Sequence, residues 1–375
     1  MPTVVVSDLH LSTASQADLL RHPGPRSALA ERVRGADHVV LLGDVVELRE
    51  GPMDDALAGA EPFFCALGEA VAGARVTIVP GNHDHRLAAP LLEARAAGAD
   101  LALDAQAPPP STGPLGTIAG WLGGADLRLS YPGVWLRDDV YATHGHYIDC
   151  HVTVPTLERL AVAVSERRIG GLPDGARTPD DYEAALAPLY ALSHRFAQAS
   201  GVGALRRRLG GGVSVGLWKQ LGSDSNGESG ALVRALVDVA IPGAVAGLNR
   251  LGLGPFEPDL SGEALRRSGL RGMAEVVERL GVDARHVVFG HTHRSGPWPH
   301  DDAAEWLLPG GGRLINTGSW VHEPAFLGDP PREGPYWPGT CVTVEDEGPP
   351  RLERLLATVP AALASSRPST DTLSS

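Results

Sequence analysis

Side chains that commonly bind metal ions follow short apolar runs at four places in this sequence. The six residues are Asp8 and His10 after the first run, Asp44 after the second, Asn82 after the third, and His291 and His293 after a late one. Within each pair spaced two apart, both side chains would point to the same side of an extended segment. A glycine comes shortly before the metal-binding residue at three of the places, as expected where a backbone turns sharply beside a crowded site.

The apolar runs themselves are predicted β-strands. Strands are expected over residues 3–6, 38–42 and 75–79, and Ala-rich stretches with helical spacing, residues 27–34 and 62–71, lie between them. This alternation predicts stacked α/β layers, in which ligands collect at the carboxyl ends of the strands. Further strands are expected at residues 127–131, 140–143, 286–289, 313–316, 340–344 and 352–356, with a turn at Pro132-Gly133 between the first two.

The pattern changes to long amphipathic stretches near residue 148 and returns to strands near residue 283. We therefore expect a core whose first part is residues 1–147 and whose second part is residues 283–360, interrupted by a helical insert, or cap, over residues 148–282. The insert contains the basic run Arg206 to Arg208 and a Gly-rich joint at residues 210–212. Residues 361–375, rich in Ser and Thr, are predicted to be a disordered tail.

Five sequence blocks, taken in order, resemble the calcineurin-like metallophosphoesterases. The blocks are Asp8-Leu9-His10, Gly43-Asp44, Gly81-Asn82-His83-Asp84, Thr143-His144-Gly145 and Gly290-His291-Thr292-His293. The resemblance covers about residues 1–147 and 283–320 and implies a four-layer α/β/β/α sandwich with a helical insertion. It also implies two metal ions, one bound by Asp8, His10 and His293 and the other by Asn82, His144 and His291, with Asp44 bridging them.

The chemistry expected of such a centre is hydrolysis of a phosphoester. Ligands that mix imidazole, carboxylate and amide groups suit Mn, Fe or Zn better than Mg or Ca. Two divalent ions carry four positive charges, of which the carboxylates of Asp8 and Asp44 offset two, so the pocket attracts phosphate. A water that bridges the two ions becomes a hydroxide nucleophile for in-line displacement at phosphorus.

Two further assignments follow from the resemblance. His83 occupies the position that stabilises the transition state or protonates the leaving oxygen, and Glu47 the position of an acid that orients this histidine. The separate histidine ligand is either His144 or His146; the Gly that follows favours His144, in which case His146 would face substrate or solvent.

The substrate is left open, because the motifs specify how the bond breaks and not what is attached to it. The Ser-Asp-Leu-His-Leu opening and the Gly-His-Thr-His-Arg block are also similar to pyrophosphatases that cleave UDP-diacylglucosamine, although those have Arg where this chain has His83. A phosphorylated small molecule or a lipid-linked substrate is expected. The alternative of another class is a catalytically inactive interaction scaffold of the same fold.

Charge and composition limit which binding partners and which cellular compartment are expected. The 375 residues carry 32 Lys+Arg against 45 Asp+Glu, a net charge of −13, which disfavours broad nucleic-acid binding. The three cysteines are too few and too widely spaced for a disulfide framework, and no apolar run spans a bilayer, although peripheral membrane contact stays open. With no signal-peptide pattern at the N-terminus, the expected location is cytoplasmic.

Overall fold

The computed structural model describes residues 2–99, 102–154, 157–198, 241–250, 254–257, 259, 262–324, 326–327 and 331–360. The run Arg206 to Arg208, the Gly-rich joint and the predicted tail at residues 361–375 lie outside the described residues. No helix in the described ranges is both long enough and apolar enough to cross a membrane.

Two β-sheets share one long strand, β5 (Asp126–Arg137). The strands of the first sheet, in spatial order, are β11 (Arg351–Arg354), β10 (Thr340–Val344), β1 (Thr3–Val6), β2 (His38–Leu42), β3 (Arg75–Val79) and β5, with β4 (Asp104–Ala107) also paired to β5. The second sheet continues from β5 to β6 (Val140–Thr143), β7 (His286–Phe289), β9 (Arg313–Thr317) and β8 (Ser295–Gly296). Strands β1, β2 and β3 run parallel to one another, as do β6, β7 and β9.

The turn predicted at Pro132-Gly133 is wrong, because β5 runs straight through it. Residues Arg75–Ile78 of β3 pair with the first part of β5, and β6 pairs with the part from Gly133 onward. The Pro-Gly pair therefore marks the point at which the strand changes partners. Gly133 is required there because a Cβ would overlap the Tyr141 hydroxyl and lie 2.5 Å from the Ala142 carbonyl oxygen.

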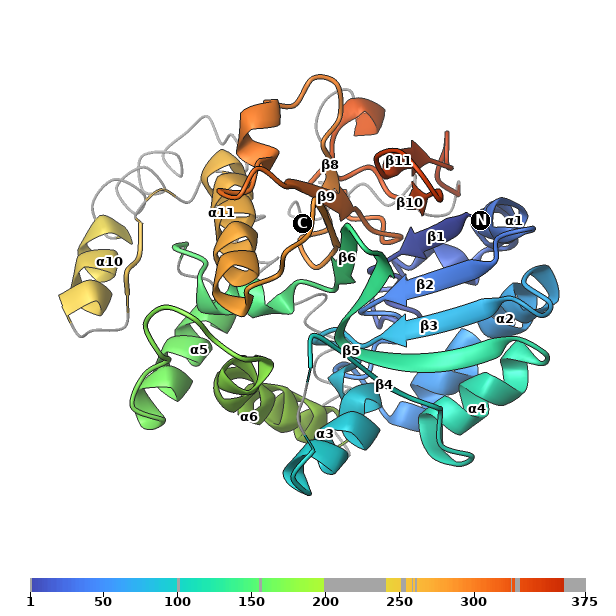
Figure 1. The fold of residues 1–375 in the computed structure, drawn as a ribbon, viewed down its shortest axis with the longest axis horizontal. Coiled ribbons are helices and arrows are strands. Elements are labelled where there is room, and N and C mark those ends of the chain that lie inside the picture. The colour runs from blue at the N-terminus through green and yellow to red at the C-terminus, as the bar shows by residue number, and fades with distance from the viewer. Residues whose placement is uncertain are drawn as a thin grey trace, which may run out of the picture.

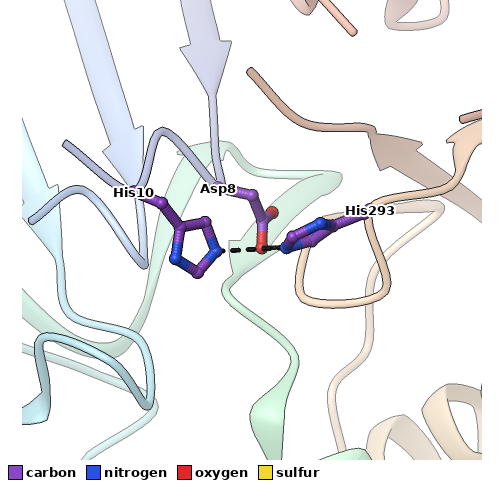
Figure 2. Close-up of side chains that lie close together, drawn as sticks. All are labelled: Asp8, His10 and His293. Carbon is purple, nitrogen blue, oxygen red and sulfur yellow. Dashed lines mark hydrogen bonds and ion pairs between the residues drawn. The ribbon is translucent and has the colours of Figure 1, made fainter. Parts of the chain in front are cut away.

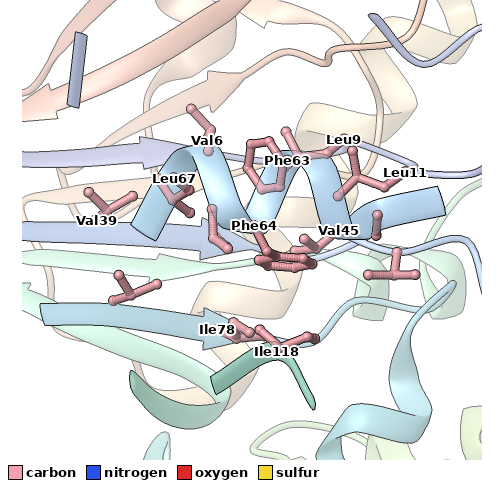
Figure 3. Close-up of a cluster of buried hydrophobic side chains, with 14 of the residues drawn as sticks. Val6, Leu9, Leu11, Val39, Val45, Phe63, Phe64, Leu67, Ile78 and Ile118 are labelled. Carbon is pink, nitrogen blue, oxygen red and sulfur yellow. The ribbon is translucent and has the colours of Figure 1, made fainter. Parts of the chain in front are cut away.

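Helices cover the outer face of each sheet, which makes four layers in the order α/β/β/α (Figure 1). The first sheet packs on α1 (Pro23–Val33), α2 (Met53–Ala70) and α4 (Gly113–Leu122). Figure 3 shows this layer, with Phe63 and Phe64 of α2 beside Val6, Val39 and Ile78 of the strands. Alternate residues of the same strands, such as Val5 and Val40, face the second sheet, as the two-residue period of a strand requires.

The predicted insert, residues 148–282, contains α5 (Leu157–Arg168), α6 (Pro179–Gln198), α10 (Ile241–Arg250) and α11 (Gly262–Leu280). Buried side chains of α5, α6 and α11 share one apolar cluster with β7 and β9. These helices thus supply the outer layer of the second sheet. A short 3₁₀ helix, η3 (His146–Cys150), connects β6 to this layer.

The sequence patterns placed most strands correctly and left some helices short. Helix α2 begins at Met53 and not at Pro62. Pro62 lies inside the helix on an exposed face, where water can donate a hydrogen bond to the carbonyl that the proline leaves unpaired. The patterns did not reveal α3 (Ala89–Ala96), β4 or α4 between β3 and β5; the 3₁₀ helices η1 (Leu19–Arg21), η2 (His85–Ala88), η5 (Ala303–Trp306) and η6 (Pro331–Glu333) are also new.

Candidate metal centre

The loops after five strands carry the predicted metal ligands. They are Asp8 and His10 after β1, Asp44 after β2, Asn82 after β3, His144 after β6, and His291 and His293 after β7. Six of these ligands, together with His83, form three overlapping groups. Within each group, one donor atom per residue lies within 4.8 Å of the others: Asp8, His10 and His293; Asp44, His144 and His291; and His10, Asp44 and His83.

Asp8 shows that the first group suits a cation. Its carboxylate is fully buried, and Oδ2 accepts hydrogen bonds from the Ser7 hydroxyl and the His291 backbone N–H, but no hydrogen bond reaches Oδ1. Nε2 of His293 lies 3.4 Å from Oδ1, and Nε2 of His10 lies 3.1 Å from Nε2 of His293 (Figure 2). A buried carboxylate oxygen without a donor is costly, and a divalent ion among these three atoms would satisfy it.

Asn82 joins His144 and His291 in a second set of donor atoms, which has an amide oxygen at its centre. Oδ1 of Asn82 lies 3.2 Å from Nε2 of His144 and 3.1 Å from Nδ1 of His291. The donors are again one oxygen and two imidazole nitrogens directed at a common point. His144 is completely buried there, so the structure brings His144 and not His146 to the predicted ligands.

Asp44 lies between the set formed by Asp8, His10 and His293 and the set formed by Asn82, His144 and His291. Its Oδ2 is 3.3 Å from Nε2 of His144 and 3.7 Å from Nε2 of His10, which belong to different groups. Its Oδ1 accepts the backbone N–H of His83 at 2.8 Å, which fixes the carboxylate plane. A buried carboxylate in this position is suited to bridge two ions.

Three of the imidazoles are oriented by a hydrogen bond on the nitrogen that faces away from the centre. Nδ1 of His10 contacts Oε2 of Glu47 at 3.2 Å, and Nδ1 of His144 donates to the Leu42 carbonyl at 3.0 Å. Nε2 of His291 donates to Oδ1 of Asp149 at 2.9 Å. Outer partners of this kind fix the tautomer and the ring orientation of metal-binding histidines.

Opposite charges hold the cluster together in the metal-free chain. Burial alone would raise the pKa of Asp44, but the positive charges of His144, His83 and His10 lower it well below its usual range. Burial would likewise lower the pKa of His10, but the hydrogen bond to Glu47 and the charge of Asp44 raise it to about 10. For His144, the charge and hydrogen bond of Asp44 overcome burial and raise the pKa to about 9.

Five of the ligand residues have a left-handed backbone. The φ angles are 53° for Asp8, 43° for His10, 52° for Asp44, 66° for His291 and 58° for His293. For residues with a Cβ this conformation costs about 1–2 kcal/mol each, and such strain concentrates at functional sites. The surrounding sheets therefore hold the ligand loops in a conformation that these residues would not choose alone.

The glycines before the ligands serve two different purposes. Gly43 has a φ of 81°, which supports the expected sharp turn. Gly81 and Gly290 are needed for space instead, because a Cβ at Gly81 would lie 2.6 Å from Cδ2 of His144 and one at Gly290 would overlap the Asp8 carboxylate.

His83 lies at the edge of the centre and is held by Glu47. Its Nδ1 is 2.5 Å from Oε2 of Glu47, a buried carboxylate whose other oxygen accepts the Arg49 backbone N–H at 2.8 Å. The His83 side chain is 27% exposed, and it lines the cavity beside the ligands. Because Nδ1 is engaged, Nε2 is the atom that is available to a substrate.

Two cavities meet at the centre and share Arg49, Asn82 and His83. The first has a volume of about 240 Å³ and is lined by Arg266, Leu270 and further residues of β7 and α11. The second has a volume of about 540 Å³ and lies between α3 and α6. A ligand held at the metal ligands therefore has room on both sides.

Similarity to known proteins identifies the family of this chain. A model of the calcineurin-like phosphoesterases matches residues 1–195, just over half of the chain. This chain belongs to the calcineurin-like phosphoesterase family. A dimetal phosphatase from Danio rerio has a TM-score of 0.32 and 12% identity, over 92% of this chain and 95% of that one. No curated protein matches the chain.

Membership of the calcineurin-like phosphoesterases implies divalent metal ions. The matched range ends before His291 and His293, so the assignment of these two ligands rests on the distances given above. Manganese, iron or zinc is the prediction from the donor set.

Two carboxylates that position the metal ligands were not among the predicted site residues. Asp149 orients His291 from η3, and Asp84 accepts backbone N–H bonds from Gly81 at 2.7 Å and Val45 at 2.7 Å, which ties the loops after β2 and β3 together. Asp84 stands inside the Gly-Asn-His-Asp block, so its position was a usable signal. Asp149 had no comparable signal, because its role depends on the approach of a distant loop.

The expectation that His146 faces substrate or solvent is wrong. The side chain is 1% exposed, and its Nε2 lies 3.0 Å from the Tyr131 hydroxyl. That hydroxyl donates to Glu183 of α6, which also accepts from Tyr147 at 2.9 Å. His146 is part of a buried polar contact between α6 and the core. His85, next to the third block, pairs with the same Glu183 at 2.9 Å.

Replacing Gly81 with alanine should weaken metal binding about 10- to 100-fold, because the new methyl group would overlap Oδ1 of Asp44 and lie 2.6 Å from Cδ2 of His144 and must displace both side chains. Metal titration with a chromophoric chelator as competitor measures this. Gly120→Ala is the matched control, since a Cβ there, in α4, meets nothing within 4 Å. Equal metal affinity in both variants would contradict the placement of Asp44 and His144 as ligands.

Metal binding to the metal-free chain should release protons and strengthen as pH rises from 6 to 9. Below pKa values of about 10 and about 9, His10 and His144 are protonated, and a metal ion must displace these protons. Calorimetric titrations in two buffers that differ in ionisation enthalpy would count them, with about two expected near pH 7. A binding enthalpy that is the same in both buffers would show that these imidazoles are already neutral.

Proposed function

We propose that this protein is a dinuclear metal-dependent phosphohydrolase that cleaves a phosphoester bond. The observation that carries the proposal is the convergence of seven donor residues on two adjacent points with Asp44 between them. Family membership supports phosphoester hydrolysis as the reaction class. The intact donor set also disfavours the inactive-scaffold alternative, since no predicted ligand lies away from the cluster.

The chain's own residues position the reacting groups. The two ions, when bound, supply Lewis-acid activation of a water nucleophile and of the phosphoryl oxygens. His83 presents Nε2 toward the cavity, with Nδ1 held by Glu47, and so is placed to donate a proton or a hydrogen bond to the leaving oxygen. Arg49 borders both cavities beside His83 and adds positive charge where a phosphate would lie.

The cavity walls favour an organic phosphate as substrate. Beside the ligands, the first cavity carries Arg266 and Arg294 together with apolar side chains such as Ile148 and Leu265. Such a wall suits either a phosphorylated small molecule or a lipid-linked substrate, including the UDP-diacylglucosamine type. A screen of monoesters, diesters and nucleoside diphosphate conjugates with added Mn²⁺ would decide among them.

Asp44→Asn should remove both metal content and activity, because the variant replaces the bridging carboxylate with a neutral amide. Elemental analysis of the purified protein and turnover of a chromogenic phosphodiester are the two measurements. Asp302→Asn, at the exposed start of η5, is a control with the same chemical change. Two bound metals and normal turnover in Asp44→Asn would refute the dinuclear proposal.

His83→Ala should lower turnover about 10²- to 10⁴-fold while metal content stays near two ions. If His83 protonates the leaving oxygen, esters with good leaving groups should lose least, which a series of substituted phenyl esters would measure. His300→Ala, an exposed histidine outside the site, should behave as wild type. Loss of a metal ion in His83→Ala would instead make this residue a ligand, in the group it forms with His10 and Asp44.

A further inference from the structure

A separate cavity of about 860 Å³ lies on the other side of η3 from the metal ligands. Its walls come from the end of η3, from α5, from the segment 170–177 and from one face of α11. Five arginines line it: Arg159, Arg167, Arg177, Arg271 and Arg279. In a chain with a net charge of −13, such a concentration of guanidinium groups around one hollow requires an explanation.

The carboxylates in the cavity balance only part of this charge. Glu166 pairs with Arg159 at 3.2 Å and Glu275 with Arg279 at 2.5 Å. Asp174 is the third acidic residue of the lining, so among the described residues of the cavity five arginines accompany three carboxylates.

The arginines are held in place from several sides. Nε of Arg177 donates to the Pro173 carbonyl at 2.9 Å, and its guanidinium lies 5.5 Å from the centre of the Tyr182 ring. Arg279 donates from Nη1 to the Gly175 carbonyl at 2.9 Å. On α11, Ser268, Arg271, Gly272, Glu275 and Arg279 follow helical spacing, so they form one stripe along the cavity.

His151 lies within reach of three of the arginines. Burial and then the positive charges of Arg177, Arg279 and Arg159 lower its pKa to about 3, so the imidazole stays neutral. Its Nε2 lies 2.8 Å from the Tyr182 hydroxyl and 3.3 Å from Nη1 of Arg177. The arginines from α5, the segment 170–177 and α11 thus all border the same cavity.

We propose that this cavity is a second binding site, for a phosphorylated organic anion. Guanidinium groups bind phosphate oxygens through paired hydrogen bonds, and the volume falls in the range of small-molecule sites. The hydroxyl and carboxylate groups of Thr153 and Asp174 add partners for the hydroxyls of such a ligand. The phosphate belongs either to a separate metabolite or to the far end of a substrate, because Val152 lines both this cavity and the one beside the metal ligands.

Calorimetric titration of the full-length chain with inorganic pyrophosphate tests the site. The Asp44→Asn variant is used as the starting protein, so that bound metal ions neither hold pyrophosphate nor hydrolyse it. It should bind pyrophosphate, and adding Arg271→Ala or Arg177→Ala should weaken binding about tenfold or more. Arg128→Ala, which removes the same charge from an exposed position on β5 outside the cavity, should have no effect.

Two further variants separate a binding role from a structural one. Arg271→Lys should keep part of the affinity, and Glu275→Gln should tighten binding, because it releases Arg279 from its carboxylate partner. Arg271 is exposed on α11, so its replacement should not affect folding even if Arg177→Ala does. The absence of pyrophosphate binding in Asp44→Asn, or equal binding in Arg271→Ala, would overturn the proposal whether or not the metal centre hydrolyses phosphoesters.

The source of the phosphate follows from kinetics of the metal-loaded enzyme. Arg271→Ala should leave kcat and KM unchanged for a small chromogenic phosphodiester. If KM rises for nucleoside diphosphate conjugates, the cavity holds the far end of the substrate. If KM for these is also unchanged while pyrophosphate binding is lost, the cavity holds a separate phosphorylated ligand.

Discussion

The packing of the two sheets against each other determines where every metal ligand lies. A thin layer of small and β-branched side chains, among them Val5, Val40, Val79 and Val288, separates them. Each of these valines comes three or four residues before a ligand, so the thickness of the layer sets the distance between the loops. The left-handed ligand residues depend on this packing, because the burial of the strands offsets the cost of their backbone conformation.

Opposite charges inside the cluster stabilise the metal-free site. Without ions, protonated imidazoles such as His10 and His144 take over the counter-charge for Asp8 and Asp44. The same ion pairs that keep the loops together then compete with the metal for the same atoms. Glu47 links the metal ligands to the residue that faces the cavity, since its Oε2 contacts both His10 and His83.

What could be predicted from the sequence was the part encoded in short segments. In residues 3–10, for example, an apolar segment that predicts a strand is followed directly by two residues that predict metal binding. The structure places these ligands together. Contacts made by chain segments that return from far away gave no local signal. Asp149 meets His291 across more than a hundred residues, and His146 is drawn into a contact with α6. The turn predicted at Pro132-Gly133 is wrong because a strand that passes from one sheet to the other has the same local sequence pattern as two strands joined by a turn.

The sharing of β5 by both sheets has a consequence for how metal ions enter and leave. Asp8, His10, Asp44 and Asn82 come from the first sheet, and His144, His291 and His293 from the second. Because one unbroken strand, β5, joins the two halves, separating them would break its pairing with one of the sheets. Rotation of a single exposed ligand side chain disturbs far fewer contacts. Among the imidazole ligands, the His293 side chain is 24% exposed and the His144 side chain is not exposed at all. His293 is therefore the ligand that solvent and an entering ion reach first, whereas His144 is held in place by the protein on all sides.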